Sequence, residues 1–408
     1  MSRFAPHAVL VAMAALCALA AFGVASAVAL PSGDEYNAPG YVVRHAWTKY
    51  AYLAGAPFRD DLSRGEEDAR VARFFELNAL IRDGERTAGN PATDEATRAS
   101  THARLEAWRE ERASIENSVE AILEGRLTAT VKDLGLTRRF GGDIVWPPVD
   151  IEFEDTPSVL VESPRSEIRK ESERLLDGDL TIERVQAIEA HAERDGETSA
   201  LVVRIGGIAL YPALIPPSGD YHFVLQDIAH EWLHHYLYFT PLGRRYYDSA
   251  ELRTLNETVA NIAGDEIGDE MFARYPLPGA QPEASATAQA PDDAAPTPAP
   301  TIDFTAEMRG LRRNVEALLA DGKIDEAERL MEEKREFLAD NGYYIRKLNQ
   351  AYFAFHGSYA DTAGSIDPIG PKLQALRDET GSVTAFVHAA QELTGEAGLD
   401  APVAGGGG

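Results

Sequence analysis

Two histidines and a glutamate form the segment of this sequence with the clearest chemical potential. Residues 230–234 read His-Glu-Trp-Leu-His. On an α-helix, residues i and i+4 lie on one face, so His230 and His234 can direct imidazole nitrogens at the same ion. Glu231 lies beside that face, near enough to reach a water on the ion. Zinc suits this arrangement, because imidazole is a good zinc ligand and because zinc tolerates an open fourth position.

The residues around this segment indicate a buried helix. Glu231 carries the only formal charge between Ile228 and Phe239. Burying two histidines and a glutamate without a cation would be costly, although a polar pocket capped by two histidines is the alternative interpretation. The only cysteine, Cys17, lies in an apolar segment near the N-terminus. We therefore expect a metal site built from histidine and carboxylate ligands.

A catalytic zinc needs a third protein ligand, and Glu257 is the best candidate. It lies within residues 254–261, on a second expected helix that also carries Gly264. Small residues on the face of Glu257 would let this helix approach the first one closely. His222 is a rival ligand, but it lies two turns upstream on the first helix. His191 is another rival, but it lies in a charged segment that we expect to be exposed.

The two segments together resemble a known group of enzymes. H-E-W-L-H at 230–234, followed by N-E-T-V-A at 256–260, is similar to the motifs of the gluzincin metallopeptidases, which include thermolysin-like and aminopeptidase-like enzymes. The resemblance covers roughly residues 200–270, and the spacing to Glu257 is a few residues longer than in thermolysin-like enzymes. It implies zinc-dependent hydrolysis of peptide bonds in a peptide or protein substrate.

The resemblance also implies roles for individual residues. His230, His234 and Glu257 would bind one zinc ion per chain, and Glu231 would act as the general base that activates a zinc-bound water. Asn261 stands where those enzymes have an aspartate that orients a ligand histidine. Its amide oxygen can still accept the imidazole N–H, so we expect it beside the metal ligands.

The donor to the developing oxyanion is less clearly marked in the sequence. Two tyrosines lie between the metal-binding helices, and an aromatic-rich stretch follows near the C-terminus. Each of these side chains is more readily explained as part of the core, because buried tyrosines usually are. The candidates are Tyr246, Tyr247, Tyr352, His356 and Tyr359.

Zincins generally bind substrate along an edge strand just before the active-site helix. Four residues occupy that position in this chain, namely Ile208, Ala209, Leu210 and Tyr211. The resemblance thus implies that an extended peptide adds to this strand through main-chain hydrogen bonds.

Hydrophobic periodicity predicts an α+β chain, with a zincin-like catalytic unit of a small mixed sheet and active-site helices, and mostly helices elsewhere. Helices are expected at 60–84 and 95–126, and strands at 149–153, 158–162, 200–205 and 208–211. The predicted regions are a signal anchor or signal peptide (1–33), a helical hairpin region (34–135), the catalytic region (136–276), an Ala/Pro-rich disordered linker or insertion (277–302), a C-terminal helical region that completes the catalytic cleft (303–395) and a disordered tail (396–408).

The N-terminal region predicts export. Ala8 to Leu30 is an uncharged run of 23 residues, about 34 Å long as a helix, whereas a bilayer core is ~30 Å thick. Arg3 precedes the run and acidic residues follow it, which favours a transmembrane helix with the rest of the chain outside the cytoplasm. Residues 25–27, Ala-Ser-Ala, have the form of a cleavage site. We expect either a single-pass membrane protein with an extracytoplasmic catalytic part or a secreted protein.

The overall charge excludes one class of partner. The chain has 39 basic and 66 acidic residues, a formal net charge of −27. Such an excess repels phosphate backbones, so nucleic acid is not an expected partner. Three alternatives to a peptidase remain: a catalytically silent zincin-like scaffold that binds a partner at the cell surface, a zinc amidase acting on non-peptide substrates, and a membrane-anchored helical adaptor. The intact Glu231 disfavours a silent scaffold, which has no need of a base.

Overall fold

The computed structural model describes residues 33–42, 45, 62–90, 92–139, 143–277, 302–360, 362–363 and 365–400. The predicted N-terminal anchor therefore lies outside the described residues, apart from Gly33, and so do residues 278–301 of the predicted linker. Within the described part of the chain, no helix is long and apolar enough to cross a membrane. The expected α+β class is confirmed, with helices predominating over small sheets.

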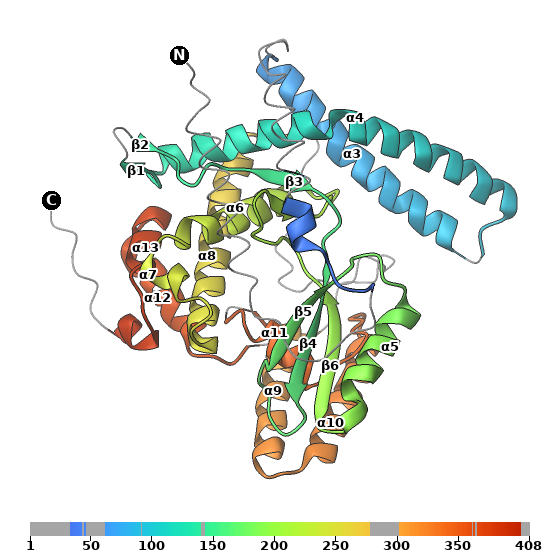
Figure 1. Cartoon of the computed structure of the whole chain (residues 1–408), viewed down its shortest axis with the longest axis vertical. Coiled ribbons are helices and arrows are strands. Elements are labelled where there is room, and N and C mark those ends of the chain that lie inside the picture. The colour runs from blue at the N-terminus through green and yellow to red at the C-terminus, as the bar shows by residue number, and fades with distance from the viewer. Residues whose placement is uncertain are drawn as a thin grey trace.

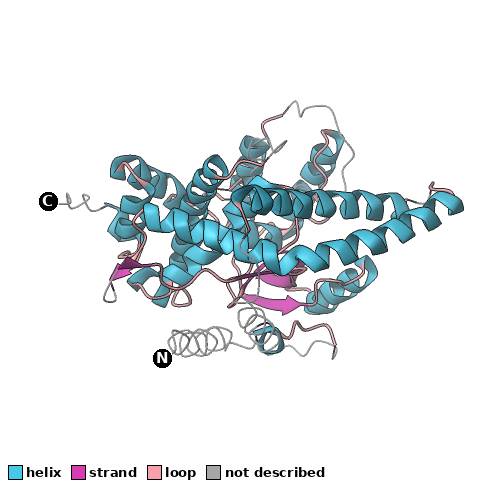
Figure 2. Ribbon diagram, turned by 90° about the horizontal axis from the view of Figure 1, so that it is seen from above, coloured by secondary structure: helices cyan, strands magenta, loops and turns pink. Residues whose placement is uncertain are grey.

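Two long helices form an antiparallel hairpin, as the sequence predicts. α3 (Arg64–Gly89) begins at a capping box, in which the side chains of Ser63 and Glu66 bond each other's backbone N–H. α4 (Glu95–Asp133) begins at Asp94, whose carboxylate caps the N-terminus. Figures 1 and 2 both show the loop end of this hairpin projecting from the rest of the molecule. Both helices run further toward the C-terminus than periodicity alone indicates.

The C-terminal half of α4 holds a short strand in place. β3 (Ile151–Phe153) pairs in parallel with β7 (Ala213–Ile215). Carboxylates of α4 accept hydrogen bonds from the other edge of β3, since Glu124 accepts the Ile151 N–H at 3.0 Å and Glu120 accepts the Phe153 N–H at 2.9 Å. The main chain just before α6 (Tyr221–Leu237) is thereby anchored to the hairpin.

A separate three-stranded antiparallel sheet lies beside these helices. β4 (Ser158–Pro164) is its central strand, flanked by β5 (Ser172–Leu176) and β6 (Thr198–Arg204). A two-residue ribbon of β1 (Arg138–Arg139) and β2 (Asp143–Ile144) completes the strands of the described chain.

Alternating side chains of β4 and β6 bury both faces of this sheet. Val159, Val161 and Leu201 face α11 (Gln350–His356), while Leu160, Ala200 and Val202 face α5 (Ile182–Ala192). Figure 1 shows these two helices lying beside the sheet. A helix from the C-terminal region thus covers a sheet from the middle of the chain.

The sheet differs from the expected one in two ways. It is antiparallel rather than mixed, because the parallel β3–β7 pair stands apart from it. The predicted strand at 208–211 is wrong: a single bridge from Ile208 to Leu214 is its only ladder contact. Pro212 has no N–H to donate, and the Leu210 carbonyl is bonded inward to His235 at 2.7 Å. This segment is therefore a buried loop.

Two crossing helices form the centre of the molecule. α6 (Tyr221–Leu237) and α8 (Ala250–Arg274) pack closely, with the short α7 (Pro241–Arg244) between them in sequence. A Cβ on Gly264 would come 3.0 Å from the Cα of His230, and one on Gly268 would come 2.6 Å from the Cα of Gln226. The expected close approach of the two helices through small residues is confirmed.

The C-terminal helices divide between the sheet and α8. α9 (Phe304–Ala320) and α10 (Ile324–Asp340) form a second hairpin in the predicted C-terminal helical region. α12 (Ile369–Thr380) and α13 (Val383–Ala390) pack against α8. Residues 396–400, placed in the tail by the sequence, form a short 3₁₀ helix instead, and Lys372 pairs with both Glu396 and Asp400.

Candidate metal centre

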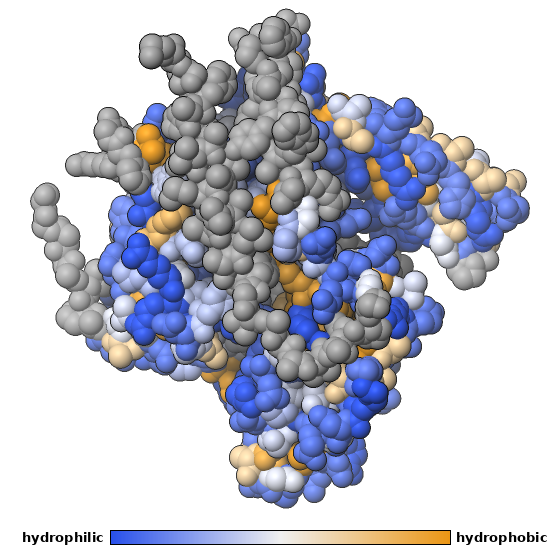
Figure 3. Space-filling model, viewed as in Figure 1, coloured by the Kyte–Doolittle hydropathy of each residue, from blue (hydrophilic) through white to orange (hydrophobic). Residues whose placement is uncertain are grey.

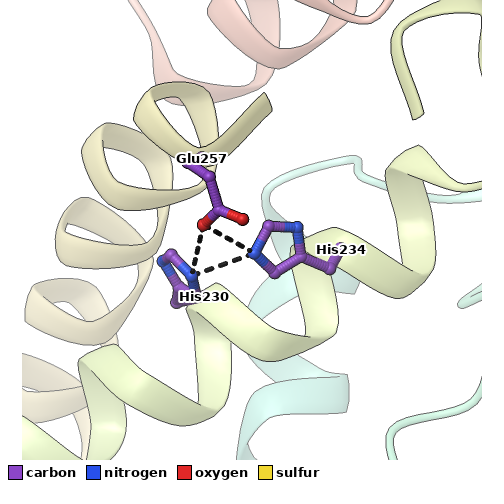
Figure 4. Close-up of side chains that lie close together, drawn as sticks. All are labelled: His230, His234 and Glu257. Atoms are coloured by element: carbon purple, nitrogen blue, oxygen red, sulfur yellow. Dashed lines mark hydrogen bonds and ion pairs between the residues drawn. The ribbon is translucent and has the colours of Figure 1, made fainter. Parts of the chain in front are cut away.

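α6 and α8 bring the three predicted ligands together where they cross. The Nε2 atoms of His230 and His234 are 3.0 Å apart. Glu257 Oε2 lies 3.8 Å from the Nε2 of His230 and 3.4 Å from that of His234. Figure 4 shows the two imidazoles of α6 and the carboxylate of α8 pointing at one another. Within the described ranges, this is the one group of three or more such side chains close enough to hold a metal ion.

The spacing of these three atoms fits a tetrahedral zinc ion. Zinc–nitrogen and zinc–oxygen bonds of about 2.0–2.2 Å place neighbouring ligand atoms roughly 3.3–3.5 Å apart. The observed separations of 3.0, 3.4 and 3.8 Å bracket that range. Two imidazoles and one carboxylate leave the fourth position open, as in catalytic rather than structural zinc sites.

Asparagine side chains lie beside both histidines. His234 Nδ1 lies 2.9 Å from Asn256 Oδ1, so that nitrogen carries a proton and donates it to the amide oxygen. His230 bonds the side chain of Asn261 and the backbone of Ala260. Asn261 thus lies where the sequence places it. Asn256 was not predicted, although its position immediately before the ligand glutamate could have indicated it.

Burial and mutual interactions strongly shift the pKa values of these three side chains. Burial lowers the pKa of His230 to about 3, with repulsion from His234 adding to the effect. Burial would also lower the pKa of His234, but attraction to Glu257 outweighs it and raises the value to about 9. Burial alone would raise the pKa of Glu257, yet the two histidines and a hydrogen bond from Tyr246 lower it to about 2.

Glu231 lies next to His230, His234 and Glu257, and the backbone of Gly207 packs directly against it. The side chain is 5% exposed. Burial raises its pKa well above the usual value, His234 opposes the shift, and Asp227 and Glu257 add to it. A Cβ on Gly207 would come within 2.5 Å of Glu231 Cγ and Oε1. The chain leaving β6 therefore passes directly over the glutamate.

Asp227 is a buried carboxyl that sequence reasoning missed. It precedes Glu231 by one helical turn, and its Oδ1 accepts the Gly207 N–H at 3.3 Å. Its Oδ2 is buried and has no hydrogen-bond partner among the described residues. Burial raises the pKa of Asp227 to about 7. An acidic residue four positions before Glu231 in an otherwise apolar helix was the available signal.

The predicted oxyanion donors differ in their distance from the metal ligands. The hydroxyl of Tyr246 donates to Glu257 Oε1. Tyr247 is 54% exposed and contacts Tyr246, with ring centroids 4.8 Å apart. The rings of Tyr352 and His356 lie 4.2 Å apart on α11. Tyr352 packs on the core of the sheet rather than on the metal ligands.

A C-terminal loop reaches the ligand helix next to Glu257. The Ala360 N–H donates to the Thr258 hydroxyl at 3.0 Å, and the neighbouring Tyr359 interacts electrostatically with Tyr246. This contact brings Tyr359, unlike Tyr352, toward the candidate site.

The two rival ligands, His222 and His191, interact with side chains outside the candidate metal centre. His222 Nε2 lies 2.6 Å from Asp269 Oδ1 at the far end of the α6–α8 contact. His191 Nε2 lies 2.6 Å from the Arg194 guanidinium. Neither side chain shares the space between His230 and Glu257.

The predicted substrate segment lies near α6 and makes several hydrogen bonds within the chain. The N–H and carbonyl of Ile208 both bond Leu214. The carbonyl of Leu210 bonds His235, as does the backbone of Ala209, and the Tyr211 hydroxyl donates to the Pro148 carbonyl at 3.3 Å. Substrate binding by residues 208–211 stays a prediction. The backbone that lies over Glu231 is that of Gly207.

The fold and the site together define an α+β protein with a His₂Glu group on two crossing helices. Comparison of the chain with known protein families, with curated proteins and with solved structures gives no match. The functional conclusion therefore depends on the geometry and chemistry of the site itself.

Proposed function

We propose that this protein is a zinc-dependent peptidase of the zincin-like, gluzincin type. The observation that carries the proposal is the convergence of His230 Nε2, His234 Nε2 and Glu257 Oε2, three acceptor atoms with 3.0–3.8 Å separations. Three lone-pair donors facing one another in a buried space repel each other unless a cation or a proton lies between them.

The protein's own groups would then divide the work of hydrolysis. A zinc ion at this position would supply Lewis-acid chemistry, polarising the scissile carbonyl and easing deprotonation of a water molecule. Glu231 takes the proton of that water as its oxygen attacks the carbonyl carbon. It then gives the proton to the leaving amine as the C–N bond breaks. Burial, which raises the pKa of Glu231, suits a group that must both accept and release a proton.

Tyr246 and Asn256 are positioning residues in this proposal. Tyr246 donates to the Glu257 oxygen that faces away from the histidines, which leaves Oε2 free for the ion. Asn256 holds the ring of His234. We propose export as well, with the apolar segment 8–30 acting as anchor or signal, and a peptide or protein as substrate.

Metal content and turnover of the full chain test this function. We expect about one zinc per chain in the wild type, loss or strong weakening of zinc binding in Glu257→Ala, and retained zinc with turnover reduced at least ~10²-fold in Glu231→Gln. Glu270→Ala, on the same helix but paired with Arg274 at the surface, serves as the matched control. A wild type without bound metal, or a fully active Glu231→Gln variant, would overturn the proposal.

The choice of substrates separates a peptidase from the alternatives. Cleavage of peptides but not of small non-peptide amides supports the proposal. Cleavage of the amides alone favours a zinc amidase, and zinc binding without cleavage of either favours a silent scaffold.

A further inference from the structure

Arg253 is a cation without a partner beside the candidate metal centre. It lies on α8 one turn before Glu257, so the two side chains share a face of the helix. Its guanidinium makes no hydrogen bond or ion pair with any described residue, and its Nε is buried. Its guanidinium lies over the ring of Tyr246, with Cζ 5.7 Å from the ring centroid.

An arginine without a carboxylate partner is unusual in a chain this acidic. Acidic residues outnumber basic ones by 66 to 39, and the described surface in Figure 3 is mainly hydrophilic. Most other arginines of the described chain pair with a carboxylate. A buried N–H without a hydrogen-bond partner is destabilising, so the retention of Arg253 Nε next to the candidate site needs a reason.

A second cation approaches the same place from the sheet. Lys170 lies in the connection from β4 to β5, with a side chain that is 11% exposed and an Nζ 2.7 Å from Glu173 Oε2. Burial lowers its pKa, and among nearby charges Arg253 lowers it further while Glu173 and Glu257 raise it. Lys170 therefore interacts electrostatically with both Arg253 and Glu257, although it comes from a distant part of the sequence.

The two carboxylates near Lys170 and Arg253 do not form an ion pair with Arg253. Glu257 already faces the two histidines and accepts from Tyr246. Glu173 bonds Lys170 but not Arg253. Two of the three N–H donors of Lys170, and all the guanidinium donors of Arg253, therefore have no hydrogen-bond partner among the described residues.

We propose that Arg253 and Lys170 form a subsite for a carboxylate of the substrate. An arginine fork matches a carboxylate in two parallel hydrogen bonds, and a lysine adds a point charge. The inference rests on the proposed peptidase function and deepens it, since it names an anionic group that the peptide must carry. Cβ atoms one turn apart are about 5–6 Å from each other, and a peptide residue spans about 3.3 Å. The bound carboxylate would thus lie near the scissile bond.

Two groups of a peptide could supply this carboxylate. One is the free C-terminus, which would make the enzyme cleave near the end of a chain. The other is an aspartate or glutamate side chain, which would permit internal cleavage. Both would bind Arg253 through a carboxylate, so the experiment must compare a free C-terminus with an acidic side chain.

Binding to the full-length Glu231→Gln protein, loaded with zinc, separates recognition from turnover. We would titrate short N-acetylated peptides in matched pairs by calorimetry: free carboxylate against carboxamide at the C-terminus, and glutamate against glutamine within the chain. We expect one carboxylate form to bind at least about tenfold more tightly than its neutral partner, because a charge-assisted pair contributes ~1.5–3 kcal/mol. The pair that shows the difference identifies the source.

Second substitutions in that background assign the preference to the subsite. Arg253→Gln should abolish the preference, Arg253→Lys should retain part of it, and Lys170→Gln should reduce it. Arg313→Gln, which removes an equal charge from an exposed position on α9, should leave it unchanged. Circular dichroism and zinc content check that each variant is folded and loaded.

The outcomes distinguish this subsite from the proposed function. Equal affinity for charged and neutral peptides, or a preference that survives in folded Arg253→Gln, would overturn the subsite while leaving the zinc chemistry intact. Carboxylate discrimination in a chain that binds no zinc would keep the subsite and remove the peptidase.

Discussion

At Gly207 the main chain lies too close to Glu231 to accept any side chain. A methyl group there would meet Glu231 Cγ and Oε1 at 2.5 Å, so Gly207→Ala should push the carboxylate out of position. Displacing a catalytic group by about 1 Å can cost ~10²-fold in rate. We expect turnover of a peptide substrate to fall by roughly that factor while zinc content stays at the wild-type level. Gly125→Ala, where the added methyl meets nothing within 4 Å, should leave turnover unchanged; equal rates in both variants would contradict the prediction.

The hydrogen bond from Asn256 to His234 gives a second prediction for a single residue. Removal of a group that orients a ligand histidine typically weakens metal affinity by ~10–100-fold. Asn256→Ala should show this loss in a competition titration against a zinc chelator. Asn256→Asp keeps an oxygen at the same distance from Nδ1 and should retain most of the affinity. If both variants bind zinc like the wild type, the tautomer of His234 is not set by residue 256.

The sequence predicts this centre well because the ligands of one helix are local. The i, i+4 relation of His230 and His234 follows from helix geometry alone. Glu257 could be chosen because small residues mark the face of α8 that meets α6. Arg253 and Lys170 could not be brought together in the same way, since one is on α8 and the other follows β4, and only the packed chain makes them neighbours.

The contact between α6 and α8 depends on two glycines, which allows a test at the level of the element. An alanine in a helix is ordinarily more favourable than a glycine by about 0.5–1 kcal/mol. At Gly268, however, a Cβ would lie 2.6–2.7 Å from the backbone of Gln226. Gly268→Ala should therefore lower the thermal midpoint of unfolding and weaken zinc binding, because the helices must separate.

Gly125 in α4 again supplies the control, since its surroundings are open. Gly125→Ala should raise the thermal midpoint slightly through helix propensity alone. A Gly268→Ala protein as stable as this control would show that α6 and α8 adjust without cost.

Strands were harder to predict than helices, for a physical reason. β4 and β6 contain short continuous apolar runs, because both faces of the sheet are buried, and they were recognised. β5 reads Ser-Glu-Arg-Leu-Leu and has a weaker signal, because it is an edge strand. Residues 208–211 have the composition of a strand, but Pro212 and the inward bonds of Leu210 make them a loop.

The N-terminal segment joins β3 through ion pairs that depend on pH. His45 Nδ1 lies 2.9 Å from Glu152 and its Nε2 lies 2.9 Å from Glu154, while the ring packs on Tyr41. Burial would lower the pKa of His45, but the two glutamates outweigh it and raise the value to about 9. A raised pKa means that the stabilisation is complete below the unfolded value of about 6.5 and is lost as the pH rises through 9.

We therefore expect the backbone amides of residues 38–42 to exchange with solvent faster, relative to intrinsic rates, at pH 10 than at pH 7. Hydrogen exchange by mass spectrometry measures this. His45→Gln should show weak protection at both pH values. Protection that is unchanged from pH 7 to pH 10 in the wild type would indicate that apolar contacts of Tyr41 hold the segment instead.

On the scale of the whole molecule, the C-terminal third and the middle of the chain fold around shared cores. α11 covers one face of the sheet, and Asn349 at its start donates to the Ala200 carbonyl at 3.0 Å. α12 and α13 extend the core around α6 and α8, and Arg377 pairs with Glu266 of α8. α8 is thus held by α6 and also by residues that come more than a hundred positions later in the chain.

This arrangement predicts that a chain ending at Leu277 does not form the metal centre. It would expose apolar side chains of α8 and of the sheet that α11, α12 and α13 cover. Each fully buried large side chain lost, such as Leu373 or Phe386, removes about 1.5–3 kcal/mol, against a typical total stability of about 5–15 kcal/mol. We expect the truncated chain to lack a cooperative thermal transition and to bind no zinc, whereas a chain ending at Asp400 should match the full-length protein in both. A soluble fragment ending at Leu277 with one bound zinc would show that the crossing of α6 and α8 needs no support from the C-terminal helices.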